Sequence, residues 1–237
     1  MPKRSRRRGS RGSKRKTWIA LALLVLIAVS GIGVYVYTTK SVPKSTTTTS
    51  STSNTTALDS YAILDTSQGT IVLQLFPQVA PQTVANFETL ANSSFYNDLV
   101  WHRIISAASD PTFSIIQTGD PNTKGAVNST RSTWGEGEGP TLVPLETNSN
   151  YPNDIGYVGL AHTSASTSGG SEFYINLTNN TSLDGQYTVF AKVVQGMSVV
   201  TAISNLPVYT SSSSPFYDQP INANNALLIS VTIQSTP

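Results

Sequence analysis

Few side chains in this sequence could act as catalysts. Only His102 and His162 could serve as bases near neutral pH, and the absence of cysteine from the 237 residues excludes thiol catalysis and cysteine-ligated metals. No HExxH, phosphate-binding-loop or GxSxG pattern is present. Serine is so frequent that it neither indicates nor excludes a Ser/His/Asp triad. Arg103 follows His102, and its guanidinium keeps its charge at any working pH and can act as a fixed hydrogen-bond donor.

Five short motifs follow one another along the chain. They are FPQVAPQTVANF (76–87), WHRI (101–104), IQTGDP (116–121), GSEFYI (170–175) and LDGQYTVF (183–190). In this order and spacing they resemble the cyclophilin family of peptidyl-prolyl cis/trans isomerases, from about Tyr61 to Ile203. The resemblance implies a mainly β fold, a closed eight-stranded barrel capped by two helices, which binds Xaa-Pro peptides on its outer face without a cofactor or metal.

The chemistry of this family suits an arginine. An Xaa-Pro amide isomerises slowly because its conjugation creates a barrier of about 20 kcal/mol. Catalysis requires a site that favours the twisted amide, in which the nitrogen regains its lone pair. By resemblance, the donor aimed at that nitrogen is Arg103. Lowering the barrier by about 5–7 kcal/mol accelerates the step roughly 10⁴–10⁵-fold.

The resemblance also assigns the residues that bind the substrate. The proline pocket is expected to consist of Ile115, Phe173, Leu183 and Tyr187, with a contribution from Phe113. Gln117 is expected to bond the substrate backbone, Ala161 and His162 to line the neighbouring extended-peptide site, His102 to shape the floor, and Glu172 to lie beside the substrate.

Two departures from the family pattern leave an alternative open. Ser114 stands where the family has a phenylalanine three residues before the glutamine, and Phe113 precedes it after a small insertion at 107–112. Glu172 replaces the usual glutamine, so a carboxylate could orient the guanidinium of Arg103 or reduce its electrophilicity. The alternative is a non-catalytic prolyl-peptide-binding module or chaperone on the same fold. A serine hydrolase remains a third and weaker option.

The motifs need a scaffold of short strands and two helices. The runs 61–65 and 70–76 are rich in β-forming residues and are joined by Thr-Ser-Gln-Gly, which predicts a hairpin. Pro81 opens a predicted helix with an apolar stripe, and a second helix is expected from Met197 to Asn205. Alternating apolar residues predict a closing strand over 227–234.

The first 59 residues differ in composition from the remainder. We expect a basic cytoplasmic tail (1–17), a transmembrane anchor (18–37), a Ser/Thr-rich linker (38–59) and an isomerase domain (60–237). A cleaved signal peptide is the alternative to the anchor. This arrangement predicts a single-pass cell-membrane protein whose catalytic domain lies outside the cytoplasm and accelerates folding of extracytoplasmic proteins.

Charge is divided unevenly along the chain. From position 41 onward there are five basic residues and all 13 acidic ones, a net charge of −8. An acidic body argues against nucleic acid as a partner, and proline-containing polypeptides are the expected substrates. No heptad pattern is present, so we expect a monomeric isomerase domain.

Overall fold

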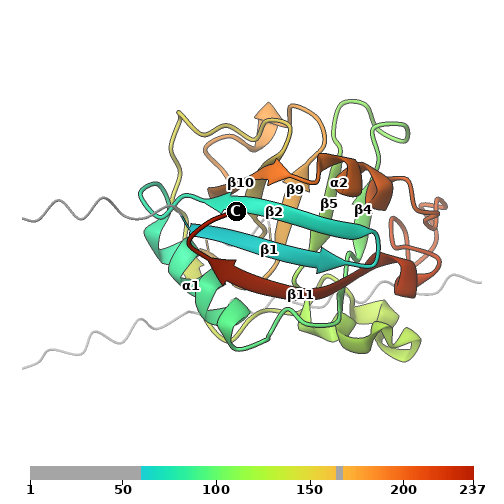
Figure 1. Ribbon diagram of the computed structural model, residues 1–237. Coiled ribbons are helices and arrows are strands. Elements are labelled where there is room, and N and C mark those ends of the chain that lie inside the picture. Colours follow the sequence, from blue (N-terminus) through green and yellow to red (C-terminus); the bar gives the residue numbers. More distant parts are fainter. Residues whose placement is uncertain (1–59, 164–167) are drawn as a thin grey trace, which may run out of the picture. The chain divides into compact units, whose positions relative to one another are not determined.

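The computed structural model describes residues 60–163 and 168–237, which form a mainly β structure (Figure 1). The strands are β1 Ser60–Thr66, β2 Gly69–Leu75, β3 Leu99–Val100, β4 Arg103–Ile105, β5 Ile115–Thr118, β6 Val143–Pro144, β7 Tyr157–Leu160, β8 Ser168–Gly169, β9 Phe173–Asn176, β10 Val189–Gln195 and β11 Leu227–Gln234. The α-helices are α1 Pro81–Asn92 and α2 Met197–Ser204, and the short 3-10 helices are η1 Pro121–Ala126, η2 Asn128–Thr133, η3 Thr181–Leu183 and η4 Ala223–Ala226.

Local sequence signals place the first strands correctly. β1 and β2 form the predicted antiparallel hairpin, whose register runs from Ser60 opposite Leu75 to Thr66 opposite Gly69. The Thr66 hydroxyl donates to the Gly69 carbonyl at 2.6 Å, which ties the two ends of the turn together. β11, the predicted closing strand, pairs with β1 on its other side, and Figure 1 shows the three strands side by side.

The large sheet is open, so the prediction of a closed eight-stranded barrel is wrong. Its nine strands follow the order β3-β11-β1-β2-β10-β7-β9-β5-β4, and the edge strands β3 and β4 do not pair with each other. Backbone atoms of both edge strands form hydrogen bonds with groups outside the sheet ladder. The Val100 amide donates to the Thr123 hydroxyl and its carbonyl accepts from the Thr118 hydroxyl, while the Ile104 amide donates to the Asp218 carbonyl. Side chains and a loop therefore replace the missing ladder.

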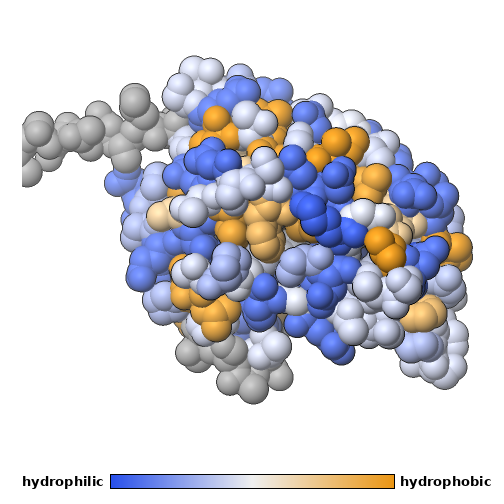
Figure 2. All heavy atoms as spheres, turned by 90° about the horizontal axis from the view of Figure 1, so that it is seen from below, coloured by the Kyte–Doolittle hydropathy of each residue, from blue (hydrophilic) through white to orange (hydrophobic). Residues whose placement is uncertain are grey.

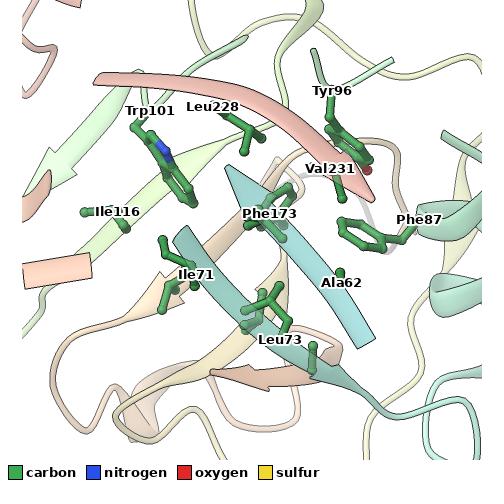
Figure 3. Close-up of a cluster of buried hydrophobic side chains, with 14 of the residues drawn as sticks. Ala62, Ile71, Leu73, Phe87, Tyr96, Trp101, Ile116, Phe173, Leu228 and Val231 are labelled. Carbon is green, nitrogen blue, oxygen red and sulfur yellow. The ribbon is translucent and has the colours of Figure 1, made fainter. Parts of the chain in front are cut away.

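The core lies between the strands of the large sheet and the two α-helices, α1 and α2. Phe173 is fully buried at its centre (Figure 3), and its ring meets Phe87 of α1 edge-on at 5.5 Å and Trp101 at 5.9 Å. Val84, Phe87 and Leu90 of α1 are all buried, which confirms the predicted apolar stripe. Such edge-to-face pairs add roughly 0.5–1.5 kcal/mol each beyond the area they bury.

The two predicted helices lie toward opposite ends of the large sheet (Figure 1). α1 packs against β11 and β6, whereas α2 packs against β2, β4 and β5. Val200 and Ile203 of α2 are fully buried. On the face drawn in Figure 2, hydrophobic residues occur in small groups separated by hydrophilic ones.

The predicted membrane anchor finds no support in the structure. No helix in the part of the chain that the structure describes is long and apolar enough to cross a bilayer. The segment 18–37, on which the anchor was predicted, lies outside the described residues, as do the basic tail and the linker. The prediction of a transmembrane helix and of a cell-membrane location is corrected accordingly.

Candidate active site

Strands β4, β5 and β9 bring the principal candidate residues onto one face of the sheet. The register pairs Arg103 with Gln117, Ile105 with Ile115, and Gln117 with Tyr174. Residues directly opposite each other in an antiparallel sheet project from the same face. The alternate residues Ile104, Ile116 and Ile175 are likewise paired and are buried in the core. The polar candidates thus stand on the face opposite the core.

A small cavity of about 100 Å³ opens on this face. Its lining combines apolar and aromatic side chains with one cation and one amide. It consists of Arg103, Phe113, Ile115, Gln117, Ala161, His162, Tyr174, Leu183 and Tyr187. Eight of these nine residues were predicted from the sequence, and the exception is Tyr174. The nine come from β4, β5, β9, the 3-10 helix η3 and the loops around them.

A second hollow of about 190 Å³ adjoins the first. The two share four lining residues, namely Arg103, Gln117, Ala161 and His162. The second hollow adds Gly135, Glu138, Thr163 and Glu172. Together they provide an apolar slot beside a polar groove, a shape suited to a proline ring and the extended backbone that precedes or follows it.

Arg103 presents an unpaired cation to the cavity. Its side chain is exposed, and among the described residues the guanidinium forms no hydrogen bond or ion pair. Its charge acts on Asp218, whose pKa is raised by burial and lowered in part by the charge of Arg103. The donors of Arg103 are therefore available to a ligand.

Glu172 accepts a hydrogen bond from Gln117, lies within ion-pair distance of His102 and forms no ion pair with Arg103. Gln117 Nε2 donates to Glu172 Oε2 at 2.6 Å, and His102 Nε2 lies 3.2 Å from the same oxygen. His102 is almost fully buried and lines neither hollow, but it lies behind two residues that do, Glu172 and Gly135. This contact fixes the amide of Gln117 at the mouth shared by the two hollows.

His162 connects two loops at the edge of the cavity. Its Nδ1 lies 2.9 Å from the Thr163 carbonyl and its Nε2 lies 2.9 Å from the Gln186 carbonyl. Its ring also stacks on Tyr187, with ring centroids 4.3 Å apart. The imidazole thus holds the wall formed by Tyr187 against the loop that follows Ala161.

The insertion before β5 brings Phe113 to the cavity. Asp110 Oδ1 accepts hydrogen bonds from the Thr112 amide and hydroxyl and from the Phe113 amide, at 2.7–3.0 Å. These bonds lower the pKa of Asp110. Ser114 turns inward, fully buried, and its hydroxyl donates to the Asp110 carbonyl. The loop therefore supplies the aromatic wall that the serine at 114 does not.

Phe173, which was expected in the proline pocket, is replaced there by its neighbour Tyr174. Phe173 is at the centre of the core and away from the cavity, whereas Tyr174 lines the cavity. Sequence reasoning missed Tyr174. The available signal was the two-residue alternation of a strand, because Tyr174 lies opposite Gln117 and must share its face.

Tyr174 is held from below by a buried amide. Its hydroxyl donates to Asn153 Oδ1 at 2.7 Å, and burial raises its pKa well above the ordinary value. Its ring passes over Gly159, where any Cβ would collide with the phenol. A glycine at 159 is therefore a condition for a tyrosine at 174.

Comparison with known proteins places the chain in a family. The protein-family model described as "Cyclophilin type peptidyl-prolyl cis-trans isomerase/CLD" matches residues 61–226 of this chain. Peptidyl-prolyl cis-trans isomerase-like 1 of Aspergillus fumigatus is 36% identical over 147 residues, which cover 58% of this chain and 78% of that protein.

The human peptidylprolyl isomerase domain and WD repeat-containing protein 1 is 36% identical over 157 residues, or 66% of this chain. The chain spans only 22% of that relative's length.

Solved structures agree on the fold. A cyclophilin-type isomerase from Cryptosporidium parvum superposes with a TM-score of 0.62 at 24% identity, covering 76% of this chain and 99% of that one. A second crystal structure of that protein, obtained in the presence of the dipeptide Ala-Pro, gives a TM-score of 0.61 at 24% identity and covers 74% and 99%. With the matched motifs and the geometry of the cavity, these findings show that the chain belongs to the cyclophilin-type peptidyl-prolyl cis/trans isomerase family.

Proposed function

We propose that this protein catalyses cis/trans isomerisation of Xaa-Pro bonds in polypeptides, with Arg103 as the catalytic residue. The observation that carries the proposal is an unpaired guanidinium beside a small apolar cavity. The proline-containing dipeptide present with the Cryptosporidium parvum neighbour belongs to the same class of ligand.

In this mechanism the proline ring occupies the cavity between Phe113, Ile115, Leu183 and the two tyrosines, Tyr174 and Tyr187. Burial of the ring holds one side of the imide bond still while the other side rotates. Burying a ring of this size contributes roughly 1–2 kcal/mol at 25 cal/mol per Å² of apolar area.

Gln117 and Arg103 act on the two ends of the rotating bond. The amide of Gln117, fixed by Glu172, is placed to bond the substrate backbone. The guanidinium of Arg103 donates to the imide nitrogen, which becomes a good acceptor only when the bond is twisted and its lone pair is localised. Because this bond is stronger in the twisted state than in either planar state, it lowers the barrier. Ala161 and His162 border the path of the extended chain.

The test is exchange NMR on a short peptide containing one Ala-Pro bond, with the full-length protein. We expect Arg103→Ala to lower the catalysed exchange about 10²–10³-fold, as loss of a transition-state donor does. Arg103→Lys keeps the charge but lacks the planar fork, so it should restore only part of the rate.

Lys192→Ala is the matched control, because Lys192 is a cation on β10 whose recorded contact is the ring of Tyr157, 4.7 Å away. Equal exchange by Arg103→Ala and the unmodified protein would remove Arg103 from the mechanism. Binding of the peptide without any acceleration by the unmodified protein would favour the non-catalytic module instead.

A further inference from the structure

A separate and larger cavity lies next to the proline cavity. It measures about 360 Å³ and shares one lining residue, Tyr187, with the proline cavity. The lining is polar apart from its aromatic and proline walls. It consists of Thr147, Asn148, Ser149, Tyr151, Pro152, Asn153, Asp184, Gly185 and Tyr187. Nothing in the mechanism above uses this space.

The lining of this cavity carries a single formal charge, the carboxylate of Asp184. Asp184 Oδ1 accepts from the backbone amide of Asn153 at 2.7 Å and from its Nδ2 at 3.1 Å. Asn153 is 1% exposed, so a buried residue anchors the carboxylate. Asp184 Oδ2 has no hydrogen-bond partner within the described ranges 60–163 and 168–237. An anchored carboxylate with one open oxygen is a site for a cationic donor.

Hydrogen bonds join the two cavities. Asn153 donates to Asp184 on one side, and its Oδ1 accepts from the hydroxyl of Tyr174 on the other. Tyr174 and Tyr187 are both walls of the proline cavity. The carboxylate of Asp184 is therefore held in a fixed relation to the proline cavity, and one polypeptide can reach both.

We propose that this second cavity is a specificity subsite for a lysine or arginine side chain near the isomerised proline. The aromatic ring of Tyr151 and the ring of Pro152 suit the methylene stem of such a side chain, and Asp184 suits its charged end. The acidic body of the chain, with 13 acidic and five basic residues from position 41 onward, attracts the same substrates at longer range. This inference rests on the proposed isomerase function and names its preferred substrate.

The test compares peptides that differ only in one charge. Lysine or acetyl-lysine is placed in turn at each of the two positions on either side of the proline, and exchange NMR gives kcat/KM with the full-length protein. At the position that reaches the cavity, we expect lysine to be preferred about three- to fivefold at low salt, a ratio that falls as salt is added.

Asp184→Asn should bring this ratio to about one. The variant keeps an oxygen that can accept from Asn153, so the local fold is retained. Asp154→Asn is the matched control, because Asp154 is the next residue after Asn153 but does not line the cavity. It removes the same charge from the same region and should keep the preference for lysine.

Two results would overturn the subsite. One is equal kcat/KM for the lysine and acetyl-lysine peptides at all four positions. The other is an equal loss of preference in Asp154→Asn and Asp184→Asn, because the preference for lysine would then come from the overall negative charge of the protein. Absence of catalysis with every peptide would instead contradict the proposed function. The subsite would then be tested by titration with the lysine peptide, followed by the chemical shifts of the Tyr151 and Gly185 amides. These shifts should change with the lysine peptide and stay unchanged with the acetyl-lysine peptide. No change with the lysine peptide would refute the subsite.

Discussion

Gln117 Nε2 donates a hydrogen bond of 2.6 Å to Glu172 Oε2, so the carboxylate at position 172 fixes the amide of Gln117. The same oxygen lies 3.2 Å from His102 Nε2, and Glu172 is 7% exposed. From the sequence, Glu172 could have oriented or weakened Arg103. Its contacts in the folded protein connect it to the binding of the substrate backbone instead.

We therefore predict that Glu172→Ala raises KM for a proline peptide more than it lowers kcat. Loss of one charge-assisted hydrogen bond that positions Gln117 should increase KM about five- to tenfold. Glu172→Gln retains an acceptor oxygen and should recover most of this loss. Steady-state isomerisation kinetics over a range of peptide concentrations provide the measurement. An increase of kcat in Glu172→Ala would instead show that the carboxylate weakens Arg103.

Tyr174→Phe should destabilise the protein while leaving the wall of the cavity in place. The change removes the hydroxyl that donates to Asn153 Oδ1, whose remaining recorded contact is a weak one of 3.5 Å from Asn176. An unsatisfied buried acceptor costs about 1–3 kcal/mol. Urea unfolding measures this loss, and kcat/KM should stay within about twofold. An unchanged unfolding free energy would contradict the role assigned to this bond.

Gly159→Ala tests the space that the ring of Tyr174 needs beside β7. A methyl group at 159 would collide with the phenol ring of Tyr174, which must then move into the cavity or tilt away. Overpacking of this kind costs about 1–3 kcal/mol. We expect both lower stability and weaker peptide binding, measured by urea unfolding and peptide titration. Peptide binding as tight in Gly159→Ala as in the unmodified protein would argue against the collision.

Asp110 is predicted to control the aromatic wall of the cavity. Asp110→Ala removes the acceptor for the Thr112 and Phe113 amides, which should release Phe113 and raise KM several-fold. Asp110→Asn retains an acceptor oxygen and should restore binding. The two KM values, with the stability of each variant, separate this effect from unfolding. Equal KM in all three proteins would show that the loop holds Phe113 without Asp110.

Asp120 should make the protein less stable as the pH rises above about 4. Its side chain is fully buried, and burial raises its pKa above the ordinary value of 3.8, with hydrogen bonds from the Asn122 and Gly135 amides opposing part of the shift. The folded state therefore holds the proton more tightly than the unfolded state does. The stability that Asp120 contributes is fully present below pH 3.8 and is lost as the pH rises through the folded-state pKa.

The measurement is urea unfolding of the unmodified protein and of Asp120→Asn across this pH range. The free energy of unfolding of the unmodified protein, relative to the variant, should decline with rising pH in the window above 3.8. A relative stability that increases with pH would contradict this prediction, because it would mean that folding lowers the pKa of Asp120.

Local patterns in the sequence predicted the elements whose causes lie within a few residues. The β1–β2 hairpin follows from two β-rich runs around Thr-Ser-Gln-Gly, and α1 follows from Pro81 and the stripe of Val84, Phe87 and Leu90. The matched motifs also placed Arg103 and Gln117 in one site. These signals suffice because turn chemistry and side-chain period act over short stretches of chain.

The tertiary structure decided the features that depend on residues far apart in sequence. At the open edges of the sheet, Thr123 and Thr118 bond the backbone groups of Val100, and the Asp218 carbonyl accepts from the Ile104 amide. No local pattern around β3 or β4 predicts these distant partners. The pairing of β9 with β5 turned Tyr174 toward the cavity and Phe173 into the core. A strand's alternation defines two faces, but only its neighbours determine which face is buried.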